Sequence, residues 1–231
     1  MLCVAGALRA GSAQRYSGAM PDVILYDNSI SSNCLKARFF LAELGIEAEL
    51  RHVPFTWPRP VDYVELNPFG RLPTLVDGDI VIAESNAILR YLARREGRND
   101  LYPVEAPGYA RVEWALDAWA TNVRPALAPA ERIAFMETGN WDEGGGRAED
   151  ADQEALKPAL EQASAGLDRF EQFCADNGTV TGTLTIVDFC IASVLWRAQR
   201  LPLDFTRWPK TAKIEAAMSA RPAFLAAEPV A

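Results

Sequence analysis

Short apolar runs alternate with helix-like segments in the first hundred residues, and their order predicts a small mixed α/β domain. The predicted strands are residues 23–27, 48–53, 72–76 and 80–83, the last two joined by an Asp-Gly-Asp hairpin turn. The predicted helices are residues 33–44, which end at Gly45, the short segment 61–66, and a segment that begins at Ser85. This βαβαββα order indicates a mixed sheet with helices on both faces.

Only helical periodicity follows Gly97, so the rest of the chain predicts an all-helical domain. The predicted helices cover about residues 109–123, 154–176, 186–197 and 209–220. Residues 186–197 (IVDFCIASVLWR) are apolar nearly all round, which is typical of a helix that is buried on every side. Thr185 and Asp188 have the spacing of a capping box at the start of this helix.

These patterns divide the chain into four parts. Residues 1–21 are expected to be a disordered extension, because Met20-Pro21 stands directly before the first strand. The expected α/β domain covers residues 22–97 and the helical domain residues 109–231. Between them, residues 98–108 are polar and contain two prolines, so they are expected to form a linker. Residues 137–153 are acidic and Gly-rich and predict a loop.

Composition and charge narrow the classes of function. The chain has 231 residues, 49% of them hydrophobic, and a formal net charge of −8, which argues against nucleic acid or an anionic membrane as partner. No apolar run reaches the ~18 residues that span a bilayer. Four cysteines without paired spacing indicate a reducing, cytoplasmic location. His52 is the single histidine, so a multi-histidine metal centre and a Ser-His-Asp hydrolase are not expected.

The first candidate site lies between the first strand and the first helix. Ser31-Ser32-Asn33-Cys34 places small polar side chains over free backbone N–H groups at a helix N-terminus. Such a turn suits an anion, including a thiolate. The alternative is that Ser31 or Ser32 merely caps the helix.

Two further candidates stand before the third strand and the third helix. If the Leu72-Pro73 bond is cis, the backbone N–H and C=O of Leu72 point outward and can pair with an extended peptide. The alternative is an ordinary trans proline at a strand entrance. Ser85 at a helix start suits a carboxylate and Glu84 beside it suits an ammonium group, so the pair fits an α-amino acid head. Helix capping is again the alternative.

Three segments resemble the cytosolic glutathione transferase family. NPFGRLPTLVDGDIVIAESNAILRYL is similar to its glutathione-binding half, TLTIVDFCIASVLWR to its buried helix and WPKTAKIEAAMSARPAF to its C-terminal helices. Together the similarity covers roughly residues 22–226. It implies an α/β thioredoxin-like N-terminal domain followed by an all-α C-terminal domain, a homodimer, glutathione as a substrate, and no metal.

The resemblance also implies roles for single residues. Leu72, beside a cis Pro73, would pair with the cysteinyl backbone of glutathione, and Glu84 and Ser85 would hold its γ-glutamyl group. Ser31 falls where the theta and zeta classes keep a catalytic serine and where omega-class relatives have a cysteine. The other binding residues implied are Ser32, Asn33, Arg59 and Arg71.

Several roles stay open. Arg59 or His52 can reach the glycyl carboxylate of glutathione, or is a solvated charge. Cys34 completes a C-x-x-C spacing in which serine replaces the first cysteine, and a buried inert thiol is favoured over a redox centre. Trp114 and Ala118, on one face of the predicted 109–123 helix, are candidates for the wall of an electrophile pocket. Interdomain packing is the alternative for Trp114.

The function expected from these features is glutathione transfer, in which the glutathione thiolate attacks a small electrophile. A glutathione-dependent isomerase similar to maleylacetoacetate isomerase and a disulfide-bond reductase are the alternative reactions. A module that keeps the fold and binds without turnover is the alternative of another class.

Overall fold

The computed structural model describes residues 23–139 and 145–228, and its N-terminal part has the predicted βαβαββα order. The expected extension over residues 1–21 and the centre of the predicted 137–153 loop therefore lie outside the described residues. The N-terminal elements are β1 (Val23–Asp27), α1 (Ser32–Leu44), β2 (Glu49–His52), α2 (Val61–Leu66), β3 (Thr74–Asp77), β4 (Ile80–Ala83) and α3 (Ser85–Arg95).

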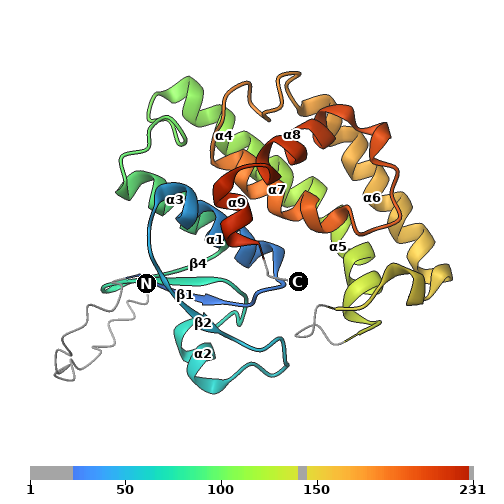
Figure 1. Ribbon diagram of the computed structural model, residues 1–231, viewed down its shortest axis with the longest axis horizontal. Coiled ribbons are helices and arrows are strands. Elements are labelled where there is room, and N and C mark those ends of the chain that lie inside the picture. The colour runs from blue at the N-terminus through green and yellow to red at the C-terminus, as the bar shows by residue number, and fades with distance from the viewer. Residues whose placement is uncertain (1–22, 140–144, 229–231) are drawn as a thin grey trace, which may run out of the picture.

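The four strands form one mixed sheet in the order β2-β1-β3-β4. β1 runs parallel to β2 and antiparallel to β3, and β3 and β4 form the predicted hairpin. Side chains alternate along β1, so that Val23 and Leu25 are buried in the core. Helices α1 and α3 lie on the side of the sheet that faces the helical part, and α2 lies on the opposite side (Figure 1). The prediction of helices on both faces is confirmed.

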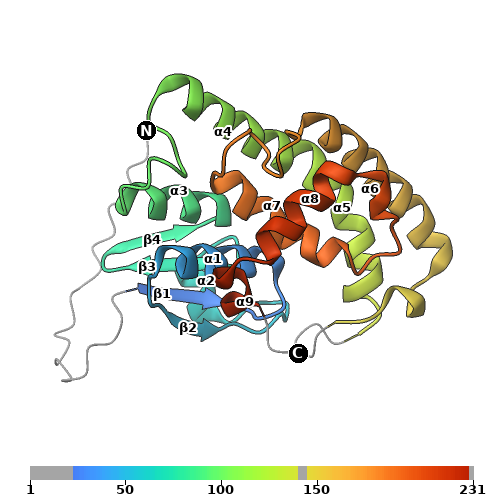
Figure 2. The ribbon, with the colours of Figure 1, turned by 45° about the horizontal axis from the view of Figure 1, so that its top comes forward.

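The rest of the described chain is helical, as predicted. Its elements are α4 (Ala106–Ala118), a π-helical turn η1 (Trp119–Val123), α5 (Arg124–Glu131), a second π-helical turn η2 (Arg132–Met136), the short η4 (Ala148–Asp150), α6 (Gln153–Phe173), α7 (Ile186–Ala198), the short η5 (Phe205–Arg207), α8 (Pro209–Ser219) and α9 (Pro222–Ala227). Figure 2 shows α7 and α9 lying over α1, so the two parts of the chain pack directly on one another.

Two predicted boundaries in the helical part were wrong. Helix α4 begins at Ala106, inside the expected linker, because Pro107 fits the first turn of a helix, where no backbone N–H is needed. Helix α6 ends at Phe173 instead of continuing to residue 176. The tail after residue 220 also contains a short helix, α9, which the Ala/Pro-rich composition did not predict.

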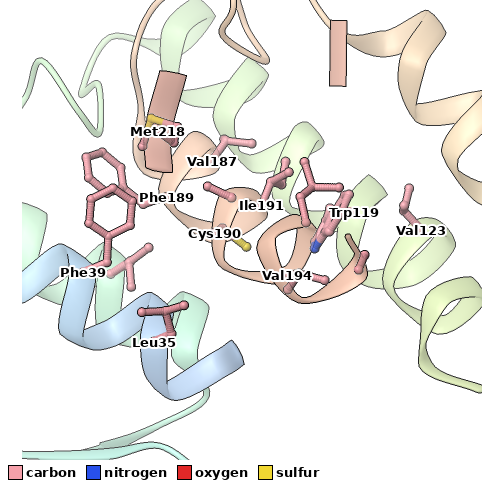
Figure 3. Packing of buried hydrophobic residues seen from close by; sticks show 14 of the residues in the cluster. Leu35, Phe39, Trp119, Val123, Val187, Phe189, Cys190, Ile191, Val194 and Met218 are labelled. Atoms are coloured by element: carbon pink, nitrogen blue, oxygen red, sulfur yellow. The ribbon is translucent and has the colours of Figure 1, made fainter. Parts of the chain in front are cut away.

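The prediction of a buried central helix is confirmed by α7. Its side chains meet α1 on one side and the α4–η1 segment on the other, and Phe189 packs against Phe39 with ring centroids 4.7 Å apart (Figure 3). The expected capping box is present, with Thr185 and Asp188 each accepting from the other's backbone N–H. None of the described helices is both long enough and apolar enough to cross a membrane.

Candidate functional site

A cavity of about 230 Å³ lies where the N-terminal ends of α1 and α3 face the α4–α5 connection. Its walls come from segments far apart in the sequence. The lining residues are Asn33, Lys36, Arg71, Leu72, Pro73, Glu84, Ser85, Asn86, Trp119, Ala120 and Arg124. A larger hollow of about 480 Å³ lies on α6, away from all the predicted site residues.

The cavity collects six of the eight predicted glutathione-binding residues. These are Asn33, Arg71, Leu72, Pro73, Glu84 and Ser85. The Leu72-Pro73 peptide bond is cis, the isomer that the family resemblance implied. Leu72 precedes β3, outside the ladder to β1, whose register ends at Thr74.

The start of α3 has an unusual backbone. Glu84 has φ 70° and ψ 109°, and it is the only residue other than glycine with a positive φ among those the structure describes. A residue held in this region costs of order 1–3 kcal/mol, and such residues cluster at functional sites. Glu84 directly precedes the first turn of α3, whose free N–H groups favour an anion. The strained residue therefore sets a carboxylate beside an anion-binding helix end.

Ser31 caps α1, which is the structural alternative considered for it. Its Oγ accepts a hydrogen bond from the backbone N–H of Cys34 at 3.4 Å. Ser31 is only 6% exposed and Ser32 5% exposed, and neither is among the residues that line the cavity. From the same turn, Asn33 does line it. Since a hydroxyl that accepts can still donate, the catalytic role of Ser31 stays a prediction.

Lys36 lies at the base of the cavity and was not among the predicted residues. It is 4% exposed, and its Nζ donates to Ser85 Oγ at 3.0 Å and to Asn86 Oδ1 at 2.9 Å. A longer contact of 3.5 Å reaches Asn33 Oδ1. All three acceptors are neutral, and no carboxylate lies within ion-pair distance of Lys36 in the described part of the chain. A buried ammonium without a counter-charge favours an anionic ligand.

The sequence contains a feature that could have pointed to Lys36. Helix α1 is enclosed on nearly every side, so that Lys36 and Arg38 are buried together with its apolar residues. Two cations inside an apolar stretch must either face partners or receive a ligand. Arg38 has partners: its guanidinium donates to Asp27 Oδ1 at 2.6 Å, Ser29 O at 2.8 Å and Ala227 O at 3.0 Å. Arg38 thereby fixes the turn that carries Ser31.

Arg59 is buried, but the structure does not bring it to the cavity. Its Nε donates to Gly70 O at 3.0 Å, and its Nη1 donates to Pro54 O. The guanidinium also lies 4.5 Å from the ring centre of Phe55. Arg59 thus holds the proline-rich loop in place, and His52 is exposed and likewise outside the cavity lining. Of the predicted cations, only Arg71 lines the cavity.

Trp114 and Ala118, the candidates for an electrophile pocket, do not line this cavity. Trp114 is 64% exposed and packs edge-on against Phe173 at 4.5 Å, over a separate hollow. Ala118 faces another hollow, on the α6 side. The helix reaches the cavity only beyond its α-helical end, where Trp119 and Ala120 in the π-helical turn line it. Trp114 and Ala118 both lie in the α-helical part of this segment, which ends just before the residues that reach the cavity.

The cysteines of the described chain are inert. Cys34, Cys174 and Cys190 are all free and buried. Burial is the largest cause that raises the pKa of Cys34 to about 12, with the charge of Asp27 adding to it. A thiol of that pKa is neither a nucleophile nor a redox centre at neutral pH, as expected for Cys34. Among the described residues, no group of three or more His, Cys, Asp or Glu side chains has the arrangement of a metal site.

The comparisons with known proteins agree with this geometry. A family model described as the N-terminal domain of glutathione S-transferase matches residues 30–95. A stringent starvation protein A homolog of Pasteurella multocida is 33% identical over 184 residues, 79% of this chain and 77% of that protein. Glutathione S-transferase 3 of Zea mays is 36% identical over 115 residues, 48% of this chain and 51% of that protein.

Among solved structures, a theta class glutathione S-transferase from the citrus canker pathogen Xanthomonas axonopodis pv. citri, with glutathione bound, is similar over nearly the whole chain. The TM-score is 0.79 at 25% sequence identity, and the match covers 92% of this chain and 99% of that one. The similarity therefore spans the thioredoxin-like part and the helical part together.

Proposed function

The chain belongs to the cytosolic glutathione transferase family, and from this premise we propose that it binds glutathione in the 230 Å³ cavity and activates its thiolate for attack on an electrophilic small molecule. The observation that carries the proposal is the meeting of four groups in that cavity. They are the Glu84 carboxylate, the N-terminal end of α3, the edge of the sheet at Leu72 and the N-terminal end of α1.

The γ-glutamyl head of glutathione fits the start of α3. Its ammonium pairs with Glu84, and its carboxylate accepts from Ser85 at the free end of the helix. Lys36 supports this arrangement in two ways, because its ammonium adds a positive charge and donates to Ser85 Oγ. With its oxygen accepting from Lys36, the Ser85 hydroxyl has its hydrogen available for the ligand.

The remainder of the tripeptide fits the opposite wall. Leu72 offers a backbone N–H and C=O to the cysteinyl unit, in the manner of an added strand. The Arg71 guanidinium makes no ion pair with any described residue, and it lines the same wall. It is the group that we assign to the glycyl carboxylate, in place of Arg59.

The sulfur would then face the N-terminal end of α1, with Asn33 on the cavity wall and Ser31 behind it. Lowering a thiol pKa of about 8.5 by about two units needs about 2.7 kcal/mol. A hydrogen bond to the charged sulfur supplies about 1.5–3 kcal/mol and a helix N-terminus about 0.3–1 kcal/mol. A donated hydrogen bond from Ser31 is therefore sufficient, provided that its side chain turns toward the cavity when glutathione binds.

Replacing Ser31 by alanine tests this role. We expect Ser31→Ala to lose turnover far more than glutathione affinity, together with about 1 kcal/mol of stability from the lost helix cap. Turnover is measured with an aryl halide, and affinity by calorimetry with glutathione. Ser164→Ala, a serine on α6 outside the cavity, serves as the control. Equal kcat in wild type and Ser31→Ala removes Ser31 from the mechanism, and failure of the wild type to bind immobilised glutathione refutes the site itself.

A binding module without turnover is the second candidate, because one of the similar proteins carries a name that refers to stringent starvation and not to a transfer reaction. Retention on glutathione with no activity toward an aryl halide or a small disulfide would favour it. The isomerase and reductase reactions are distinguished by the same screen, extended to a cis-enedione acid. A homodimer and a cytoplasmic location are proposed on the family alone. Light scattering tests the dimer against the monomer mass of 25.4 kDa.

A further inference from the structure

The cavity has one cation more than glutathione requires. Although the whole chain carries a net charge of −8, three of the charged groups that line the cavity are positive, Lys36, Arg71 and Arg124, against the single carboxylate of Glu84. Glutathione brings two carboxylates, one ammonium and the thiolate. In the binding mode proposed above, the carboxylates pair with Lys36 and Ser85 and with Arg71, the ammonium pairs with Glu84, and the thiolate faces Ser31 and the N-terminal end of α1. Arg124 is left without a glutathione group.

Arg124 also differs from the other cations in its position. It is the first residue of α5 and follows the π-helical turn that carries Trp119 and Ala120, so it belongs to the helical wall of the cavity. Lys36 and Arg71 belong to the thioredoxin-like wall. A second substrate has to enter between the sulfur and the helical wall, since the opposite wall is taken by the tripeptide.

The guanidinium of Arg124 uses one terminal nitrogen in an ion pair and leaves the other without a hydrogen bond in the described part of the chain. Its Nη2 lies 2.8 Å from Glu131 Oε2, which fixes the side chain from behind. Its Nη1 is buried and makes no hydrogen bond with any residue in the described ranges. The side chain as a whole is 27% exposed and lines the cavity, so an anionic oxygen in the cavity can approach its positive charge.

We infer that Arg124 is the subsite for an anionic group on the electrophile, so that the substrates of this protein are electrophiles that carry a carboxylate. The inference rests on the proposed glutathione site. Arginine is suited to this role, since its planar donors match the two oxygens of a carboxylate. Trp119 and Ala120, which precede Arg124 in the chain, add apolar residues to the same wall for the carbon skeleton.

A halogenated acid shows the reaction in its simplest form. The glutathione sulfur forms a bond to the carbon that bears the halogen, and the carbon–halogen bond breaks. The halide leaves with the bonding electron pair, and the thiol proton passes to solvent. Arg124 takes no part in these bond changes. It holds the carboxylate so that the carbon faces the sulfur, and is therefore a specificity-determining residue.

Iodoacetate and iodoacetamide are a matched pair of probes, because they share the reacting carbon and the leaving group and differ in charge. For the wild type we expect the ratio of kcat/KM for iodoacetate over iodoacetamide to exceed the ratio of the uncatalysed reactions. Arg124→Gln should lower this ratio by about tenfold to hundredfold, mainly through the KM for iodoacetate. Arg124→Lys should keep part of the preference. Arg71→Gln, the matched control, should raise the KM for glutathione and leave the ratio unchanged.

A binding measurement gives an independent readout. Phenylacetate and phenylacetamide are titrated into the wild type and Arg124→Gln, with and without S-methylglutathione, which occupies the glutathione site without a reactive thiol. We expect selective loss of phenylacetate binding in the variant. The inference is overturned if both ligands weaken equally, if the two kcat/KM values fall together, or if Arg124→Gln changes only glutathione affinity.

The glutathione site and the Arg124 subsite can be refuted separately. If the wild type does not bind glutathione at all, the proposed function fails, and the arm without S-methylglutathione still decides whether Arg124 selects carboxylates. If glutathione binds and the two probes of each pair behave alike, only the subsite at Arg124 is wrong.

Discussion

Replacing Lys36 by methionine separates the binding of glutathione from the stability of the fold. Methionine is similar in length and flexible, so it fills the same space between α1 and α3. The change removes a buried ammonium that has only neutral partners at 2.9 Å and 3.0 Å, Asn86 Oδ1 and Ser85 Oγ. If glutathione is the missing counter-charge, the variant loses affinity for it while the empty protein loses little.

The two magnitudes follow from the contacts. Each hydrogen bond from a charged donor contributes about 1.5–3 kcal/mol, but taking the ammonium out of water costs several kcal/mol, so the two terms nearly cancel in the unliganded protein. We expect the Tm of Lys36→Met to change by a few degrees at most, at about 2–4 °C per kcal/mol for a chain of this size. Loss of one charged contact to the ligand carboxylate weakens glutathione binding by about tenfold to hundredfold.

Calorimetry with glutathione and thermal unfolding without it measure the two effects. Lys157→Met, on the exposed side of α6, removes the same charge outside the cavity and is the control. If Lys36→Met binds glutathione as tightly as Lys157→Met, then Lys36 is not part of the ligand site. If Lys36→Met is instead unfolded at room temperature, the ammonium is a structural element and the argument from its missing counter-charge is wrong.

Two further predictions concern buried groups. Burial raises the pKa of Asp188 from 3.8 to about 6, so its contribution to the free energy of unfolding is full below about pH 3.8 and is lost as pH rises through 6. Urea unfolding should therefore show the wild type gaining roughly 2 kcal/mol relative to Asp188→Asn between pH 7 and 4, and a flat difference would contradict this. In a chain with Cys3 replaced by serine, an aromatic disulfide reagent at pH 8 should modify no thiol until denaturant is added, because Cys34 and Cys174 have pKa values of about 12 and are buried with Cys190. Rapid modification of the native variant would show that one of these side chains is accessible.

Local patterns predicted the sheet and the buried helix because their physical causes are local. β1 and β4 have the predicted bounds, because a short β-rich run that is ended by turn residues defines where the strand begins and ends. The start of α3 at Ser85 was likewise visible as a helix-capping pattern. The local pattern before Pro73 left cis and trans open, and only the resemblance to the family implied the cis bond that the structure has. Six predicted residues therefore met in one cavity although nothing in their spacing showed a contact.

The helical wall of the cavity could not be predicted in the same way. No element was predicted for residues 124–136, yet Pro125 lies in the first turn of α5 and Pro129 is accommodated within that helix. The segment that reaches the cavity, Trp119 to Arg124, lies C-terminal to Trp114 and Ala118, and partly beyond the predicted 109–123 helix. Lys36 donates to Ser85 and Asn86 on α3, and Arg124 faces a cavity whose other wall belongs to the N-terminal part. Both depend on how distant segments of the chain pack, which local patterns do not show.

The contacts of Arg38 bear on the order in which this protein is assembled. One guanidinium joins Asp27 at the end of β1 and the turn at Ser29 to Ala227, in the last described helix. On the ribosome Arg38 is synthesised 189 residues ahead of Ala227. The turn that carries Ser31 therefore stays incomplete throughout synthesis, and α9 closes the earliest part of the molecule only when the chain is almost finished.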